Sequence, residues 1–312
     1  MKTLTILATV TIAIATSAYG MTSQQVNDLL NKAIKGDSET LSSLQSAAQA
    51  GDANAEAGIG SFLYLKHHYK QGIAWLVKSA GQNNAHAEDN LGFSYSKGLG
   101  VSRNYAKSVY WYKKSADQGY AKAEYNLGVA YYNGIGVSRN YAKADYWYKK
   151  AAKHGDARAE YNLGVFYYKG LGVSRNYAKS VYWYKKSADQ GYAKAEYNLG
   201  VAYYNGIGVP RNYAKADCWY KKAADQGYAK AELHLGVLYA KGWGVPRNNA
   251  KADYWFQKAA DQGYAKAEYS LGVVYYEGEG IPQDSMAALY WFKKAAAQGY
   301  QPAERGIRII EK

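Results

Sequence analysis

The sequence predicts an all-α protein built as a solenoid of stacked helix pairs, because the chain after residue 85 repeats itself every 36 residues. A Leu-Gly pair marks each repeat and occurs at residues 91–92, 127–128, 163–164, 199–200, 235–236 and 271–272. A Gly-x-Gly element begins seven residues after each of these leucines, and a tryptophan follows each leucine by twenty residues. Fixed periods of this length are typical of solenoids, in which each unit contacts mainly its neighbours.

Each repeat is interpreted as two helices. In the second repeat a first helix is expected over about 122–133, where apolar residues recur on one stripe around Leu127. Gly128 has no side chain and would let the partner helix approach closely. Asn140 is suited to cap the start of the second helix, and Gly155 is suited to end it. No bounded segment alternates apolar and polar residues, so strands are not expected.

The Gly-x-Gly element, Gly134 and Gly136 in the second repeat, invites comparison with a phosphate-binding loop. Such a loop needs a strand before its glycines and a helix directly after them. Here a helix precedes Gly134, and no Gly-Lys-Ser/Thr sequence follows. We therefore interpret the element as a turn between two helices that uses the backbone freedom of glycine.

No other pattern predicts catalysis, a metal site or a cofactor. The five histidines do not combine with Cys or Asp at metal-ligand spacing. A glutamate recurs near the start of each first helix, as at Glu124, and is interpreted as a stabilising charge at the positive helix end rather than a general acid. Cys218 stands where other repeats have tyrosine and lacks a catalytic signature.

The repeat unit resembles the Sel-1-like repeat, a relative of the tetratricopeptide repeat. The matching motif is A-E-Y-N-L-G-x-x-Y-x-x-G-x-G-V followed by A-x-x-W-x-x-K-A-A, in six tandem copies over 85–300. The resemblance implies a right-handed superhelical solenoid of antiparallel helix pairs. Family members described as acting on β-lactams carry paired cysteines in each repeat, and this chain has a single cysteine.

The regions outside the six repeats divide into four further segments. Residues 1–20 have a lysine, a short apolar run and a small-x-small end, which predict a cleaved signal peptide. Residues 21–52 are expected to form an N-terminal helical hairpin cap, and 53–84 a short degenerate repeat without the Gly-x-Gly loop. Residues 301–312 are expected to form a C-terminal capping helix, since terminal repeats of solenoids are atypical.

The formal net charge is +14, which favours acidic partners. The signal peptide predicts a periplasmic or secreted protein, so nucleic acid is not the expected partner. The expected partner is a protein with an acidic or extended segment, or an anionic envelope polymer. No stretch after the signal peptide is apolar and long enough to predict a transmembrane segment.

The partner-binding surface is predicted on the face of the first helices opposite the leucines, which by resemblance to tetratricopeptide repeats lines a concave groove. Tyrosine and arginine often carry interface energy, and here basic and tyrosine residues recur on that face. Asparagines beside them match a ligand-holding asparagine of peptide-binding tetratricopeptide repeats, although valine replaces the second asparagine of that arrangement. The candidate residues are Lys122, Tyr125, Asn126, Tyr132, Arg158, Tyr161, Asn162, Tyr168, Lys194, Tyr197, Asn198, Tyr204, Lys230, Lys266 and Tyr269.

These observations predict an exported, non-enzymatic scaffold for protein–protein interaction. Two alternatives remain open at this point. One is a periplasmic immunity protein that neutralises a secreted toxin, a task that the resemblance implies for some exported members. The other is an envelope protein that acts on peptidoglycan or β-lactams.

Overall fold

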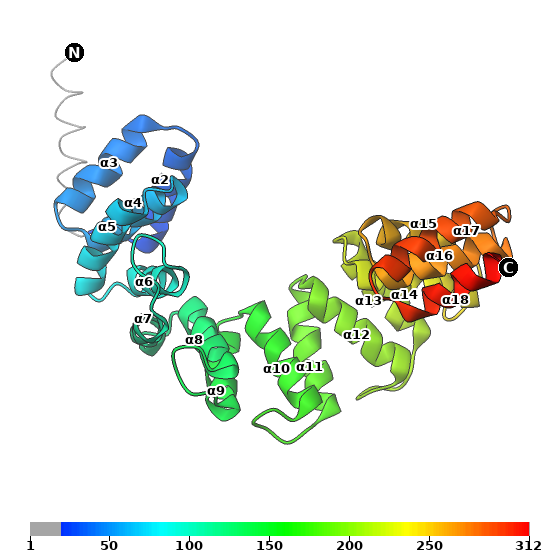
Figure 1. Ribbon diagram of the computed structural model, residues 1–312. Helices are drawn as coiled ribbons and strands as arrows, with labels where there is room; N and C mark the ends of the chain where they lie inside the picture. The colour runs from blue at the N-terminus through cyan, green and yellow to red at the C-terminus, as the bar shows by residue number, and fades with distance from the viewer. Residues whose placement is uncertain (1–19, 312) are drawn as a thin grey trace, which may run out of the picture. The chain divides into compact units, whose positions relative to one another are not determined.

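The computed structural model describes residues 20–311, so all of the predicted signal peptide except Gly20 lies outside the described residues. Across 20–311 the regular secondary structure is helical and no strand is present, which confirms the all-α prediction. The chain divides into two compact units, Met1–Asp156 and Ala157–Lys312. Each unit is a stack of helix pairs (Figure 1).

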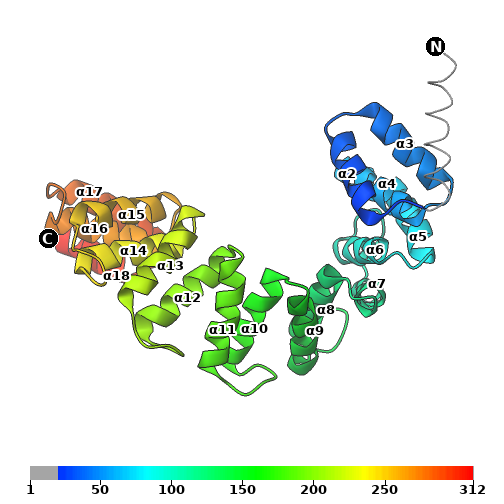
Figure 2. The same cartoon turned by 180° about the vertical axis from the view of Figure 1, so that it is seen from behind.

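The helices of each unit follow one another with short connections. In the first unit they are α2 (Ser23–Ile34), α3 (Ser38–Gln49), α4 (Ala53–Leu65), α5 (Tyr69–Gly81), α6 (Ala85–Lys97), α7 (Tyr105–Asp117), α8 (Ala121–Asn133) and α9 (Tyr141–Lys153). In the second unit they are α10 (Ala157–Lys169), α11 (Tyr177–Asp189), α12 (Ala193–Asn205), α13 (Tyr213–Asp225), α14 (Ala229–Lys241), α15 (Asn249–Asp261), α16 (Ala265–Glu277), α17 (Ser285–Ala297) and α18 (Gln301–Ile310). Within each unit, every helix packs against the next one along the chain (Figures 1 and 2).

The Leu-Gly pair brings the two helices of a repeat together. In α12, Leu199 is fully buried, and Gly200 lies against the ring of Tyr220 on α13. A Cβ atom added to Gly200 would lie 2.5 Å from that ring, a distance that real Cβ contacts do not reach. The same relation holds between Gly128 and Tyr148 in the first unit, so the close approach predicted from the glycine is confirmed.

The Gly-x-Gly element ends the first helix and turns the chain towards the second. Gly206 has a left-handed backbone with a φ of 71°, and its N–H donates to the carbonyl of Ala202. The N–H of Ile207 donates to the same carbonyl at 3.0 Å. Asn212 then accepts a hydrogen bond from the N–H of Lys215 at 2.9 Å and caps α13. These backbone donors serve the helix end, which confirms the turn.

The recurring glutamate does more than the sequence indicated. Glu196, expected only as a charge near a helix N-terminus, is 3% exposed and accepts a hydrogen bond from the Gln226 side chain at 2.8 Å. Gln226 is the C-cap residue of α13, so the pair joins the start of one helix to the end of its partner. Glu232 and Gln262 repeat this contact at 2.7 Å in the next repeat.

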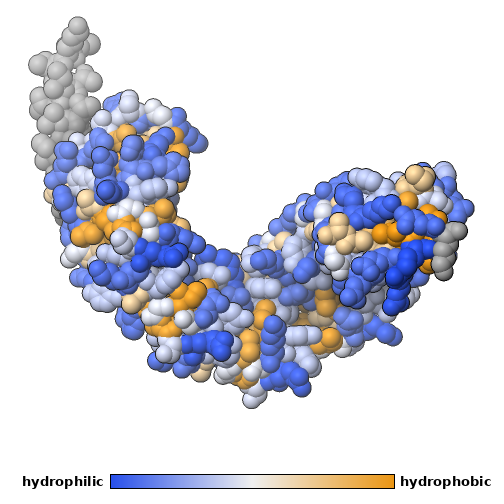
Figure 3. Space-filling view, viewed as in Figure 1, coloured by the Kyte–Doolittle hydropathy of each residue, from blue (hydrophilic) through white to orange (hydrophobic). Residues whose placement is uncertain are grey.

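The visible surface is mostly hydrophilic, with apolar patches of limited extent (Figure 3). No helix within 20–311 has the length and apolar character needed to cross a membrane.

Candidate functional site

Grooves open between some of the successive first helices within each unit. In the second unit one groove of about 340 Å³ lies between α10 and α12 and has α11 as its floor; we call it the α10–α12 groove. Its lining includes four of the predicted residues, Tyr161, Tyr168, Tyr197 and Asn198. The structure therefore brings these side chains from two neighbouring repeats into one cavity.

The floor and walls of the α10–α12 groove are apolar and aromatic. Val181 and the buried Tyr184 of α11 form part of the floor, and Tyr177 stands at its edge. Tyr168 is 40% exposed, and its ring packs against that of Tyr177 with the centroids 5.4 Å apart. Lys169 provides a cation at the rim. The groove thus offers exposed aromatic surface beside a single positive charge.

A groove of the same construction lies between α6 and α8 in the first unit, with a volume of about 360 Å³. Asn126 lines this groove, together with Phe93 and Tyr112. Tyr125 and Tyr132 do not line it. Tyr125 packs on Tyr148 and Tyr132 on Tyr141, with ring centroids 5.9 and 5.7 Å apart.

Several predicted tyrosines also hold neighbouring helices together. Tyr197 packs on Tyr220 of α13 and on Tyr228, the N-cap residue of α14, with ring centroids 5.8 and 5.2 Å apart. Burial raises the pKa of Tyr197 to about 12. Tyr161 and Tyr269 make the equivalent contacts. Truncating these tyrosines would disturb packing as well as any surface that they present.

The predicted row of cations is only partly available to a partner. Lys122 forms an ion pair at 3.0 Å with the fully buried Asp89, which also accepts a hydrogen bond from Asn126 at 3.0 Å. Lys122, the predicted basic residue of the second repeat, therefore has a structural role in the first unit. Arg158 and Asn162 are half-buried on α10, whereas the remaining three predicted cations are exposed: Lys194, Lys230 and Lys266.

None of these predicted cations lines the grooves between α6 and α8, α10 and α12, or α14 and α16, which lie within residues 20–311. The groove-lining lysines are Lys97, Lys169 and Lys241, which stand just before the glycine that ends each first helix. Their recurrence at that position was the signal in the sequence that could have identified them.

The corresponding space between α12 and α14 is occupied by aromatic side chains. His234 stands where the preceding repeat has Asn198, and its ring lies 5.0 Å from that of Tyr220. Trp243 stacks on Tyr213 with centroids 5.3 Å apart, and the predicted residue Tyr204 lies against both His234 and Trp243. Burial lowers the pKa of His234, which favours its neutral form.

The comparison of the chain with known families agrees with this architecture. The Sel1 repeat model matches residues 85–120, 121–156, 157–192, 193–228, 229–264 and 265–300. The chain belongs to the Sel1 repeat family.

Two solved structures resemble this Sel1-repeat chain along most of its length. A protective antigen of uropathogenic Escherichia coli with the same repeat fold is 32% identical, with a TM-score of 0.85 over 96% of this chain. The match spans 66% of that protein's length. A Sel1 repeat protein from Oxalobacter formigenes is 35% identical, with a TM-score of 0.69 over 77% of this chain and 96% of that chain. No curated protein sequence matches the chain.

The last two Sel1 repeats form a groove whose chemistry differs from the others. This α14–α16 groove has a volume of about 500 Å³ and is lined by residues of α14, α15 and α16 and of the loops after α14 and α16. Asp253 of α15 stands where the α10–α12 groove has Val181, and Glu279 stands where that groove has Ile207. Burial, with a smaller contribution from Glu279, raises the pKa of Asp253 to about 6.

Replacing Asp253 with valine, the residue at 109 and 181, is expected to raise the free energy of unfolding above pH 6 by about 1–2 kcal/mol. The folded-state pKa lies above the ordinary value of 3.8, so ionisation of Asp253 opposes folding as pH rises through about 6. The gain should shrink towards pH 4, where the carboxyl group is neutral in the folded state and only partly ionised in the unfolded state. Urea denaturation from pH 4 to 8 measures it. A gain that is the same at every pH would contradict the assigned cause.

The described residues contain no group of three His, Cys, Asp or Glu side chains arranged to hold a metal ion. Cys218 is exposed and is not part of a disulfide. The features that the grooves present are aromatic surface, hydrogen-bonding amides and a few charges, which are properties of a binding surface.

Proposed function

We propose that this Sel1-repeat protein is a non-enzymatic scaffold that binds another polypeptide in the grooves between its first helices. The observation that carries the proposal is the α10–α12 groove, where Tyr161, Tyr168, Tyr177 and Tyr197 surround an apolar floor. Tyrosine combines a large apolar surface with a hydroxyl group and is enriched among residues that dominate binding energy. The Sel1-repeat fold is itself suited to protein–protein interaction.

The charge of the chain supports an acidic partner segment. The net charge is +14, and Lys194, Lys230 and Lys266 are exposed on the first helices of the second unit. Exposed cations of this kind accelerate the encounter with an acidic segment more than they tighten the final complex. The aromatic groove would then supply most of the affinity.

The proposal places the protein outside the cytoplasm, in the periplasm or the surrounding medium. Two observations support this location. The first twenty residues have the composition of a signal peptide. The E. coli relative is a protective antigen, a description that fits a protein accessible to the host.

Photo-crosslinking tests both parts of the proposal. A benzoylphenylalanine residue at position 168, in the full chain expressed in its own cells, is expected to give a covalent adduct with one partner protein. The adduct should appear in the periplasmic or medium fraction. The matched control is position 182, where Tyr182 is 56% exposed on α11 and does not line the groove. Equal crosslinking at both positions would refute the groove assignment, and an adduct confined to the cytoplasm would refute export.

A further inference from the structure

The carboxylate of Asp253 is buried without a partner. Asp253 is 8% exposed, and neither of its side-chain oxygens accepts a hydrogen bond. Burial of an ionised carboxylate is costly unless a cation or donors compensate it. Asp89, by contrast, is fully buried but has both the Lys122 ammonium and the Asn126 amide as partners.

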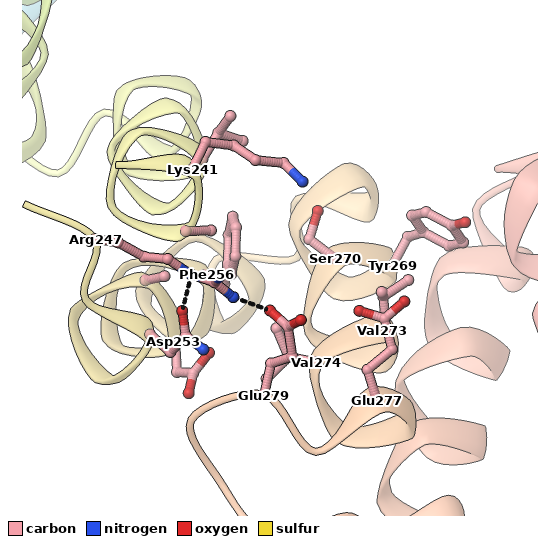
Figure 4. Close-up of a pocket in the computed structure, with 14 residues that line it drawn as sticks. Lys241, Arg247, Asp253, Phe256, Tyr269, Ser270, Val273, Val274, Glu277 and Glu279 are labelled. Carbon is pink, nitrogen blue, oxygen red and sulfur yellow. Dashed lines mark hydrogen bonds and ion pairs between the residues drawn. The ribbon is translucent and has the colours of Figure 1, made fainter. Parts of the chain in front are cut away.

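Asp253 lines the α14–α16 groove, whose charged groups leave it uncompensated (Figure 4). Arg247 reaches from the loop after α14 and pairs with Glu279 at 2.8 Å. The Nε–H of Arg247 donates to Asn249 at 3.3 Å. Glu277 and Lys241 are the other charged residues of the lining. The lining therefore contains three carboxylates and two cations, and one of these cations, Arg247, is already paired with Glu279.

The remaining lining of this groove is largely apolar. Val237, Phe256, Val273 and Val274 contribute to it, and Phe256 is 5% exposed. A volume of about 500 Å³ lies within the range of ~300–1,000 Å³ that is typical of small-ligand sites. A ligand that fits would carry an aliphatic chain ending in a positive charge.

The repeats themselves show that the acidic character is local. The α6–α8 and α10–α12 grooves have Val109 and Val181 in place of Asp253. Asp217 is the corresponding residue of the fourth repeat, but His234 and Trp243 fill the space between α12 and α14. Among the described repeats of the second unit, the open groove with a buried carboxylate is thus the one between α14 and α16.

We propose that the α14–α16 groove binds the side chain of a lysine, with its ammonium group against Asp253 and its methylene groups against the apolar lining. That the lysine belongs to a polypeptide rests on the function proposed above, whereas the cation site does not depend on it. The ligand would supply the partner that Asp253 lacks in the structure, and lysine joins a charge to a flexible aliphatic stem.

The test uses the full chain and the probe N-acetyl-lysine methylamide, followed by amide chemical shifts in two-dimensional NMR at pH 7.5. Saturable shifts are expected at residues of α14, α15 and α16. The uncharged analogue N-acetyl-norleucine methylamide, which keeps the four-carbon stem but has no ammonium group, should bind about tenfold more weakly or not at all, because it cannot form the ion pair. Equal affinity for the two probes, or no saturable shift with the lysine probe, would overturn the proposal.

Two variants locate the site. Asp253→Asn should weaken binding of the lysine probe about tenfold or more, since the amide keeps the shape and removes the charge. Asp217→Asn is the matched control and should leave binding unchanged. Undiminished binding by Asp253→Asn would overturn the proposal, as would a loss in Asp217→Asn alone.

The pH dependence provides an independent readout. The charged groups that share the groove lining with Asp253 are Lys241, Arg247, Glu277 and Glu279, and burial, with a smaller contribution from Glu279, raises the pKa of Asp253 to about 6. Binding needs the ionised carboxylate, so affinity for the lysine probe should fall as pH drops from 7.5 to 5. A pH-independent affinity would overturn the assignment of Asp253. Because the probe is a single amino acid, its binding is unaffected by whether position 168 crosslinks a partner, and the two proposals can fail separately.

Discussion

Replacing Gly208 with alanine is expected to lower the free energy of unfolding by about 3 kcal/mol. Gly208 is the second glycine of its Gly-x-Gly element and has a φ of 75°, in the left-handed region. A Cβ atom there would lie 2.4 Å from the carbonyl oxygen of Tyr177, at the start of α11 in the preceding repeat. Because the contacted oxygen and carbon atoms of Tyr177 belong to its backbone carbonyl group, the clash cannot be relieved by rotating a side chain.

Gly206→Ala is the matched control for this prediction. It has a similar φ of 71°, but a Cβ atom there would lie 3.2 Å from the Cβ of Arg211, so it is expected to cost about 1 kcal/mol. Urea denaturation followed by circular dichroism measures both variants. If the two variants lose the same free energy of unfolding, backbone conformation alone, without contact between repeats, accounts for the Gly-x-Gly spacing that recurs in this chain.

Tyr168→Ala is expected to weaken binding of the crosslinked partner about thirtyfold, the effect of losing roughly 2 kcal/mol at an interface hot spot. Tyr168 is the most exposed of the predicted tyrosines in the α10–α12 groove, and its ring packs against Tyr177, which is itself 38% exposed. Its truncation should therefore change the melting temperature little. Isothermal titration calorimetry with the purified partner measures the affinity.

Tyr182→Ala provides the control for affinity. Tyr182 is on α11 of the same repeat, is 56% exposed and lies edge-on to Trp183. It removes an equivalent aromatic ring from outside the groove and should leave the affinity unchanged. An unchanged affinity in Tyr168→Ala, or an equal loss in both variants, would show that the partner binds elsewhere.

Charge reversal at the predicted cations would test the binding surface less specifically than Tyr168→Ala does. Lys122→Glu would place a carboxylate beside the buried Asp89 and remove its ion-pair partner, so it would destabilise the first unit. Exposed Lys194 carries no such structural penalty. Only the positions of the surrounding side chains distinguish these two lysines, which have the same place in the repeat.

The sequence was sufficient to predict the helix pairs because the signals are local and repeated. Asn212 as a helix cap, Gly206 as a helix end and Leu199 beside Gly200 each depend on residues within a few positions or on a fixed 36-residue spacing. Six copies of the same pattern, each preceded by a helix and not by a strand, then favour a turn over the phosphate loop that one copy alone would suggest. The family followed from the same motif.

The site was less predictable, because it is formed by side chains from neighbouring repeats that are far apart along the chain. Tyr168 and Tyr197 belong to one groove, yet Tyr125 and Tyr132, their counterparts in the second repeat, do not line the described groove of the first unit. His234 fills the space that is left open where the preceding repeat has Asn198. Asp253 brings a carboxylate without a partner into the α14–α16 groove, at the place where the third repeat has Val181. Periodicity places each residue on its helix face, but whether that face is packed, paired or open depends on the volume and charge of the residues opposite, and only the tertiary structure brings those together.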